Sequence, residues 1–153
     1  YRGWRALAEP MAEYMAAVPI PAAAGDAPSL VVPIPTTRRR LRERGYNQAE
    51  LLARGVARRT GRTMITALER VSAAASQTTL QPAARRANVA GSFRVAGDLK
   101  AVLTGRHLLL VDDVLTTGAT ALECGATLVA AGVRAISVLT FARALDVARL
   151  IET

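Results

Sequence analysis

The sequence Leu108-Leu-Leu-Val-Asp-Asp-Val-Leu-Thr-Thr-Gly-Ala-Thr120 decides the fold of this chain. Its apolar first half ends in Asp112 and Asp113, which is the pattern of a parallel strand buried on both faces. A turn containing Gly118 follows, and the next residues predict a helix over 119–131. Open α/β sheets bind ligands just outside the carboxyl ends of their strands. The sequence therefore predicts a binding site at the two aspartates and the turn.

The turn has the chemistry of a phosphate-binding loop. The first amides of a helix have no partner within the helix, and the positive end of the helix dipole lies beside them. Gly118 lets the backbone approach a ligand closely, and the hydroxyl groups of Thr116, Thr117 and Thr120 add hydrogen-bond donors. The start of the predicted helix is therefore well suited to an anion such as a phosphate group.

The two aspartates need a different partner, because carboxylates repel a phosphate group. Two vicinal sugar hydroxyls suit them, since a carboxylate accepts hydrogen bonds from both. A ribose 5-phosphate would satisfy the carboxylates and the loop together. The alternative is that Asp112 and Asp113 only cap the following turn. We favour the sugar, because adjacent carboxylates at the end of a buried strand are costly without a partner.

The rest of the chain predicts further strands and helices around this site. Helices are expected over 1–17 and 47–59, and strands over 29–35, 63–71, 89–95, 106–113 and 134–141. Pro10 indicates a break or a first-turn position in the first helix, whereas Asn47 is placed to cap the second. The prolines of the first strand indicate either that the strand lies near an edge of the sheet or that the prolines lie at the end of the strand. Alternating strands and helices with short connections predict right-handed βαβ units and a mostly parallel sheet.

Length and composition are those of one globular domain. The 153 residues, of which 51% are hydrophobic, suffice for a single core, so we expect one domain over 1–153. No apolar run approaches the roughly 20 residues of a membrane-spanning helix, so no membrane span is expected. The chain starts without a secretory signal pattern, which favours a cytoplasmic protein.

The net charge of +8 comes almost entirely from arginine, because Lys100 is the only lysine. Five arginines crowd into one short segment: Arg38, Arg39, Arg40, Arg42 and Arg44. An arginine side chain binds two phosphate oxygens at once and stays charged, which fits an anionic small molecule. A nucleic-acid contact surface and a merely solvated face are the alternatives for the remainder of this cluster.

The segment 111–120 resembles the motif with which type I phosphoribosyltransferases bind 5-phosphoribosyl-1-pyrophosphate (PRPP). Over most of its length the chain is similar to the ComF family, which includes the GntX-like members and is linked to bacterial competence and DNA uptake. The residues that carry this likeness are Val32-Pro-Ile-Pro35, Arg40, Arg44-Gly-Tyr-Asn-Gln48, Gln77-Thr, Leu80, Arg85, Asn88-Val and Gly91-Ser-Phe93. The resemblance implies the α/β type I phosphoribosyltransferase fold, a mostly parallel sheet flanked by helices, with a flexible loop and a small hood.

The resemblance also implies roles for the residues of the predicted site. Asp112 and Asp113 would bind the ribose hydroxyls of PRPP. The 5-phosphate would be held by Thr116, Thr117, Gly118, Ala119 and Thr120. Mg²⁺ would bind as a cofactor together with PRPP, with the two aspartates as further candidate ligands.

Two further segments are implied to meet the pyrophosphate of PRPP. The turn over 36–45 would supply Thr36, Thr37, Arg38, Arg40 and Arg44. The polar stretch 72–86 is expected to be the flexible loop that closes over bound PRPP and shields the reaction from water. Its candidate residues are Gln77, Arg85 and Arg86.

The expected reaction is transfer of the phosphoribosyl group of PRPP to an unknown nitrogen acceptor, with release of pyrophosphate. Thr116 stands where hypoxanthine-type enzymes carry an aspartate, so a 6-oxopurine handled through that residue is not expected. Two other functions stay open: a module that senses PRPP or a nucleotide without turnover, and a DNA-associated competence factor whose arginines bind nucleic acid.

The sequence leaves several properties of the whole protein open. Activity as an enzyme is one of them, and the oligomeric state, with a dimer as one option, is another. ComF-like proteins usually begin with a zinc-binding cysteine module, and none precedes Tyr1. Either the sequence starts after that module or this protein lacks it.

Overall fold

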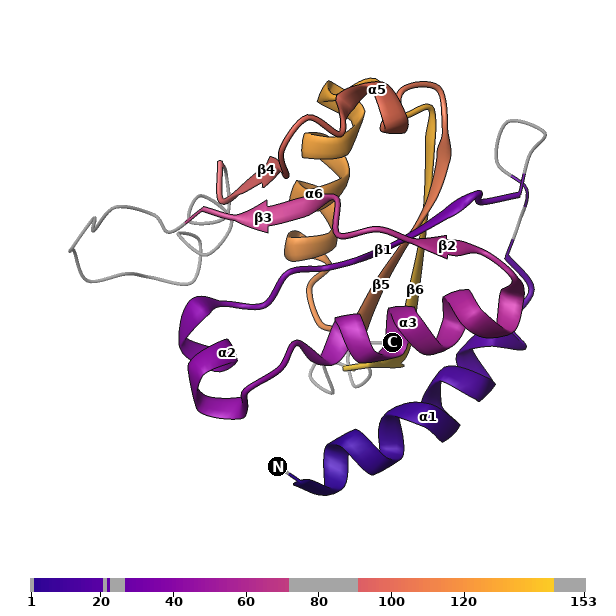
Figure 1. Ribbon diagram of the computed structural model, residues 1–153, viewed down its shortest axis with the longest axis vertical. Helices are drawn as coiled ribbons and strands as arrows, with labels where there is room; N and C mark the ends of the chain where they lie inside the picture. The colour runs from indigo at the N-terminus through magenta and orange to yellow at the C-terminus, as the bar shows by residue number, and fades with distance from the viewer. Residues whose placement is uncertain (1, 21, 23–26, 72–90, 145–153) are drawn as a thin grey trace, which may run out of the picture.

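Four parallel strands form the main sheet in the computed structural model, which describes residues 2–20, 22, 27–71 and 91–144. In sheet order the strands are β2 (Thr63–Met64), β1 (Leu30–Pro33), β5 (His107–Leu115) and β6 (Ala135–Arg143). The helices are α1 (Arg2–Ala16), α2 (Arg38–Arg44), α3 (Gln48–Thr60), α5 (Lys100–Leu103) and α6 (Ala119–Ala130). Parallel pairing of β1 with β2 and of β5 with β6 confirms the expected mostly parallel sheet (Figure 1).

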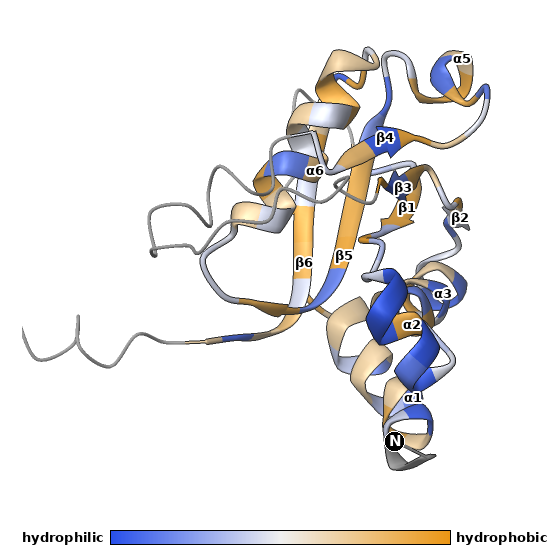
Figure 2. Cartoon of the chain, turned by 90° about the vertical axis from the view of Figure 1, so that its left-hand side faces the viewer, coloured by the Kyte–Doolittle hydropathy of each residue, from blue (hydrophilic) through white to orange (hydrophobic). Residues whose placement is uncertain are grey.

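The side chains of β5 divide the hydrophobic core into two halves. Leu108 and Leu110 pack with residues of α6, whereas Leu109 and Val111 pack with α1 and α3. All four are fully buried. Successive side chains of a strand point to opposite faces, so a continuous apolar run is needed where helices cover both faces. Figure 2 shows the apolar colour along the buried part of β5, and α2 as a strongly hydrophilic helix.

A second, antiparallel sheet of two strands is here called the hood, and the hood and flexible loop implied by the resemblance stay predictions. This sheet consists of β3 (Leu68–Arg70) and β4 (Phe93–Val95), and it packs against α6 within one hydrophobic cluster. The single strand expected over 63–71 is therefore wrong, because this segment changes sheets. Ile65 N donates to Val31 O on β1 over 2.9 Å, and the chain then leaves the main sheet to form β3. Of the strand expected over 89–95, residues 89 and 90 lie outside the described part of the chain, and Phe93–Val95 form β4.

Strand β1 lies inside the sheet, between β2 and β5, so the expected edge position is wrong. The other expected position for the prolines, at the end of the strand, is confirmed, because Pro33 is the last residue of β1. On the side of β2, Val31 O accepts a hydrogen bond from the amide of Ile65, the residue after β2. On the side of β5, Ile34 N donates to Val111 O over 2.9 Å. Successive residues therefore face opposite neighbours, and the missing amide of Pro33 faces the side where β2 has already ended.

Two other elements differ from the sequence prediction. Helix α1 continues through Pro10, where a break was one option. Pro10 and Ala6, whose carbonyl loses its usual helical donor, are both exposed, so water can satisfy that carbonyl. Strand β6 is less buried than expected, because it lies at the edge of the described sheet, and Val138 and Phe141 are 47% and 44% exposed. No helix in the described part of the chain is long and apolar enough to cross a membrane.

Helices α1 and α3 approach each other closely at Gly55. A Cβ atom at this position would lie 2.5 Å from the Cβ of Ala12, whose side chain is fully buried. Side chains do not approach so closely, so packing requires glycine here. Glu9 of α1 also forms ion pairs with Arg58 and Arg59 of α3.

We expect Gly55→Ala to lower the free energy of unfolding by about 1–3 kcal/mol, because the added methyl group forces α1 and α3 apart. Gly125→Ala in α6 is the matched control, since its Cβ would meet Ile136 Cδ1 at an ordinary 3.8 Å. This control should stabilise the protein by about 0.5–1 kcal/mol through helix propensity. Urea unfolding measures both changes, and a Gly55→Ala variant as stable as the original protein would contradict the packing argument.

Candidate functional site

The site forms where β5 extends beyond β1. Ile34 N donates to Val111 O just after the end of β1. Strand β5 continues to Leu115 and over this last part pairs with β6. The sequence predicts the end of this strand at Asp113, which is two residues early. Asp112 and Asp113 therefore lie beside an open flank of the sheet and not at the end of a strand.

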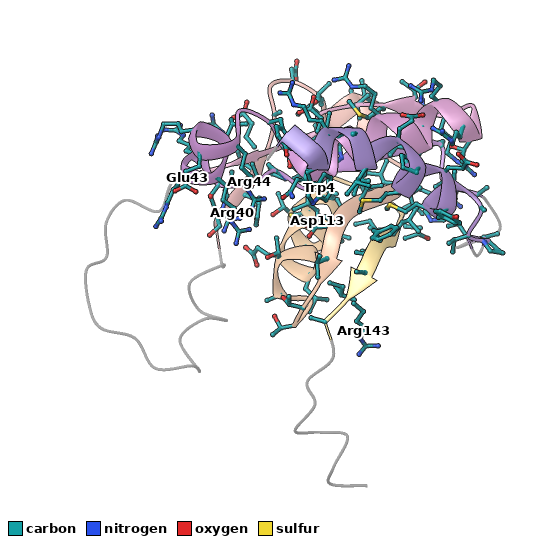
Figure 3. All side chains as sticks on the ribbon, turned by 90° about the horizontal axis from the view of Figure 1, so that it is seen from below. Trp4, Arg40, Glu43, Arg44, Asp113 and Arg143 are labelled. Carbon is teal, nitrogen blue, oxygen red and sulfur yellow. The ribbon has the colours of Figure 1, made fainter. Side chains whose placement is uncertain are left out.

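A cavity of about 410 Å³ opens at this flank. Three parts of the fold line it: the segment from β1 to α3, the end of the hood strand β3, and the end of β5 with residues 116–120, here called the phosphate loop. The lining residues are Ile34, Pro35, Thr36, Thr37, Arg40, Arg44, Asn47, Gln48, Ala49, Arg70, Asp112, Asp113, Val114, Thr116 and Thr120. Figure 3 shows Arg40 and Arg44 reaching from α2 towards Asp113. The cavity thus brings three guanidinium groups and two carboxylates together.

The carboxylates of Asp112 and Asp113 each accept a hydrogen bond from the next backbone amide. Asp113 N donates to Asp112 Oδ1, and Val114 N donates to Asp113 Oδ1, both over 2.9 Å. Both bonds stay within β5 and neither reaches the phosphate loop. They orient the two side chains at the cavity wall without capping the turn that follows.

Burial raises the pKa of Asp112 to about 7, from an ordinary value of 3.8. The amide of Asp113 opposes this shift, whereas the carboxylate of Asp113 adds to it. Arg40 lowers the pKa of Asp112 by attraction, which is the weakest of these effects. Near neutral pH the ligand-free site therefore holds a carboxyl group that is poorly solvated as an anion.

The phosphate loop turns the chain from β5 into α6. Gly118 occupies the N-cap position of α6 with a φ of 77°, in the left-handed region that favours glycine. Ala119 N lies 3.4 Å from Thr117 Oγ1. Thr116 and Thr120 line the cavity, whereas Thr117, Gly118 and Ala119 are not among its lining residues. The roles predicted for these five residues concern a bound phosphate and stay predictions.

The arginine-rich segment is a helix and not the predicted turn. Thr37 caps α2, because its Oγ1 accepts a hydrogen bond from Arg40 N over 3.2 Å. Thr36 and Thr37 line the cavity together with Arg40 and Arg44, whereas Arg38 does not. The helix therefore separates the arginine cluster into a part that faces the cavity and a part that faces solvent.

The sequence analysis placed three polar residues of the cavity wall outside the predicted binding site: Asn47, Gln48 and Arg70. Asn47 stands at the N-cap position of α3, but the expected side-chain cap is wrong. Its Nδ2 donates instead to Ile34 O over 3.0 Å and fixes the segment that follows β1. Gln48 accepts a hydrogen bond from Arg44. Asn47 and Gln48 belong to the pattern that carries the ComF resemblance, which was the available signal.

Arg70 enters the cavity from the hood. Its Cζ lies 5.0 Å from the centroid of the Phe93 ring. Burial lowers the pKa of Arg70 from its ordinary value, and Arg40 acts in the same direction. Among the described residues, neither arginine has a carboxylate within ion-pair distance. The predicted loop residues lie outside the described part of the chain: Gln77, Arg85 and Arg86.

The fold of the chain is the phosphoribosyltransferase fold. A solved structure of the allosteric regulatory enzyme of purine biosynthesis matches 90% of this chain and 25% of its own, with a TM-score of 0.57 and 19% identity. Glutamine PRPP amidotransferase from B. subtilis, complexed with ADP and GMP, matches 88% of this chain and 26% of its own, with a TM-score of 0.58 and 17% identity. At these identities the likeness shows the fold alone, and it confirms the fold class predicted from the sequence.

Sequence relatives confirm the resemblance to the ComF family. DNA utilization protein YhgH of Escherichia coli K12 is 34% identical over 119 residues, which are 77% of this chain and 51% of the relative. Competence protein F of Haemophilus influenzae is 36% identical over 118 residues, which are 76% of this chain and 51% of the relative. No family model matches the chain. The chain spans about half the length of these relatives.

We expect Asp112→Asn to stabilise the ligand-free protein at alkaline pH. The folded protein binds a proton at Asp112 up to about pH 7, whereas the unfolded chain releases it near 3.8, so stability falls as the pH rises through this window. The full difference between the two pKa values corresponds to ~4 kcal/mol of unfolding free energy. Because Asp112 is partly solvated, we expect Asp112→Asn to raise the free energy of unfolding by about 1–3 kcal/mol at about pH 8.

Urea unfolding at about pH 8 and about pH 3.5 measures this effect. The gain should fall to a few tenths of a kcal/mol (~0.2) at the lower pH, where the carboxyl is largely neutral in both states. Asp98→Asn is the control, because Asp98 is exposed and its replacement should change stability by less than ~0.5 kcal/mol. An equal gain at both pH values would show that ionisation of Asp112 is not its cause.

Proposed function

We propose that this domain binds PRPP with Mg²⁺ and transfers its phosphoribosyl group to a nitrogen acceptor. The observation that carries the proposal is the single cavity in which two carboxylates, the phosphate loop and three arginines meet. PRPP has a vicinal diol, a monophosphate and a pyrophosphate. Each of these groups has a chemically matched part of the cavity wall.

The ligand groups are assigned by charge and by hydrogen-bonding capacity. The ribose hydroxyls would donate to Asp112 and Asp113, and the 5-phosphate would accept from the phosphate loop and the first amides of α6. The pyrophosphate would lie between Arg40 of α2 and Arg70 of the hood. Arg70 is partly desolvated, and Arg40 lowers its pKa by repulsion. A multiply charged anion between the two guanidinium groups would relieve this repulsion.

The residues of the cavity support displacement at the anomeric carbon by positioning and charge. The lone pair of the acceptor nitrogen would form a bond to C1 of the ribose, while the bond from C1 to the pyrophosphate oxygen breaks. The electron pair leaves with the pyrophosphate, and the acceptor nitrogen releases its proton to water. Arg40 and Arg70 would stabilise the charge that develops on the leaving group. Bound Mg²⁺ supplies further neutralisation of that charge, and the oxygen ligands of Asp112 and Asp113 fit such a hard cation.

Calorimetry with PRPP, with and without Mg²⁺, tests the proposal. The original protein should bind PRPP with Mg²⁺, and Asp112→Asn with Asp113→Asn should abolish binding while the circular dichroism spectrum stays unchanged. Arg70→Ala should weaken binding by roughly 10–100-fold, because one charge-assisted hydrogen-bonding partner is lost. Release of pyrophosphate across a panel of nitrogen acceptors then distinguishes a transferase from a sensor.

Arg94→Ala is the matched control for Arg70. Arg94 also lies in the hood, but it pairs with Glu69 over 2.8 Å outside the cavity. The Arg94→Ala variant should bind PRPP with the same affinity as the original protein. Equal losses for the two arginines would indicate a general charge effect, and PRPP binding that survives the double aspartate variant would refute the assignment of the ribose site.

A second candidate function is a contact with nucleic acid through the solvent side of α2. Arg38, Arg39 and Arg42 are exposed and do not line the cavity, and Arg39 alone of the three forms an ion pair, with Glu43 over 2.7 Å. The relatives are named for DNA utilization and competence, which agrees with such a role. The two functions are compatible, because they use different faces of the same helix.

Replacing Arg38, Arg39 and Arg42 by Ala should weaken binding of a single-stranded DNA oligonucleotide and lower its salt slope by about 2, while PRPP binding persists. Fluorescence anisotropy at several salt concentrations measures this slope. The control removes three exposed arginines elsewhere, at Arg54, Arg94 and Arg106. DNA binding that is unchanged in the α2 variant, or reduced equally in the control, would exclude α2 as the contact surface.

A further inference from the structure

A groove of about 560 Å³ lies between α6 and β6, apart from the cavity described above. Leu122 and Val129 of α6 line one wall, and Ile136 and Val138 of β6 line the other. None of the residues that line the groove is charged. It is therefore an apolar depression between the last helix and the edge strand of the described sheet.

The groove leaves large apolar side chains in contact with water. Leu122, Val129 and Val138 are 74%, 58% and 47% exposed. Helix α6 already packs its other face into the core through Cys124 and Leu128, so it is apolar on two sides. Such a helix is typical of a buried position, with partners on both sides. A cover for this side of α6 and β6 is therefore expected.

The segment that directly follows β6 has the side chains to provide this cover. Residues 145–153, which lie outside the described part of the chain, read Leu145-Asp-Val-Ala-Arg-Leu-Ile-Glu-Thr153. Val147, Leu150 and Ile151 follow the spacing i, i+3, i+4, which places apolar side chains on one side of a helical turn. In the same spacing Arg149 and Glu152 fall on the opposite side together with Leu145, and Asp146 falls beside Leu150 at the border between the two sides.

The chain enters this segment at the mouth of the groove. Ala144 N donates to Leu115 O over 2.9 Å, and Leu115 and Gly118 line the groove at the end where α6 begins. The stretch of α6 from Gly118 to Val129 is about 17 Å long. Nine residues span about 13 Å as a helix and about 30 Å when extended, so the segment can reach along the groove. A tethered segment also has a high effective concentration compared with a separate molecule.

We propose that residues 145–153 bind in the groove of their own chain and cover Leu122, Val129 and Val138. Docking there places the segment against Leu115, which precedes the phosphate loop, and against Gly118 within that loop. The covered groove would thereby support the backbone that turns from β5 into α6. A second copy of the chain and a different protein are the other possible occupants.

Methyl NMR on the whole chain tests this proposal. Leu150→Ser with Ile151→Ser should shift the methyl resonances of Leu122, Val129 and Val138, because the covering side chains are lost. The matched control, Arg149→Ser with Glu152→Ser, alters the polar side of the same segment and should leave them in place. The methyl groups of Leu7, which is 55% exposed on α1, should not respond to either variant.

Three results would overturn the proposal. The groove methyl resonances could stay in place in the Leu150 and Ile151 variant, which would leave the groove uncovered by this segment. They could shift with protein concentration in step with a change of mass in sedimentation, which would identify a second copy as the occupant. They could also respond equally to the variant and to the Arg149 and Glu152 control, which would indicate an indirect effect. The proposal is supported if the groove methyl resonances shift only in the Leu150 and Ile151 variant, while the mass in sedimentation stays constant.

Discussion

The site depends on the difference in length between two neighbouring strands. Strand β1 ends at Pro33, and β5 runs on to Leu115 with β6 as its partner. In a regular strand Asp112 and Asp113 point to opposite faces of the sheet. Both can reach one cavity because no neighbouring strand separates the two faces at this flank. The hydrogen bond from Asn47 Nδ2 to Ile34 O fixes the chain just after β1, where it leaves β5, and the cavity lies beside this point.

The charges around this flank lower the stability of the ligand-free protein. Burial shifts the pKa of Asp112 upwards and that of Arg70 downwards, so each group is held where its charged form is disfavoured. The cavity keeps carboxylates and guanidinium groups on different walls, where they do not neutralise one another fully. A molecule with hydroxyl donors at one end and phosphate oxygens at the other would match this separation. By contrast Cys124, whose pKa burial raises to about 12, serves the core and offers no nucleophile.

Local patterns predicted the parts of the site that local sequence builds. The apolar run before Asp112, and Gly118 after it, identified the central strand and the phosphate loop, because both depend on neighbours in the chain. Arg70 could not be found this way, since its position depends on the pairing of β3 with β4, and Arg70 pairs with Phe93 across a long segment. Strand β6 reads as buried because an apolar run does not reveal whether anything covers it. The cap of α2 at Thr37 was missed because a cluster of arginines is a poor signal for a helix start.

The cations of the cavity are all arginines, and this choice has a consequence for how binding can be controlled. A lysine in the same place could be silenced by acetylation of its amine, or could lose its proton when buried. A guanidinium group is not a target of acetylation, and it stays charged near neutral pH even where burial lowers its pKa, as at Arg70. Under the proposed function, control of anion binding through protonation would therefore act on Asp112 and not on the arginines.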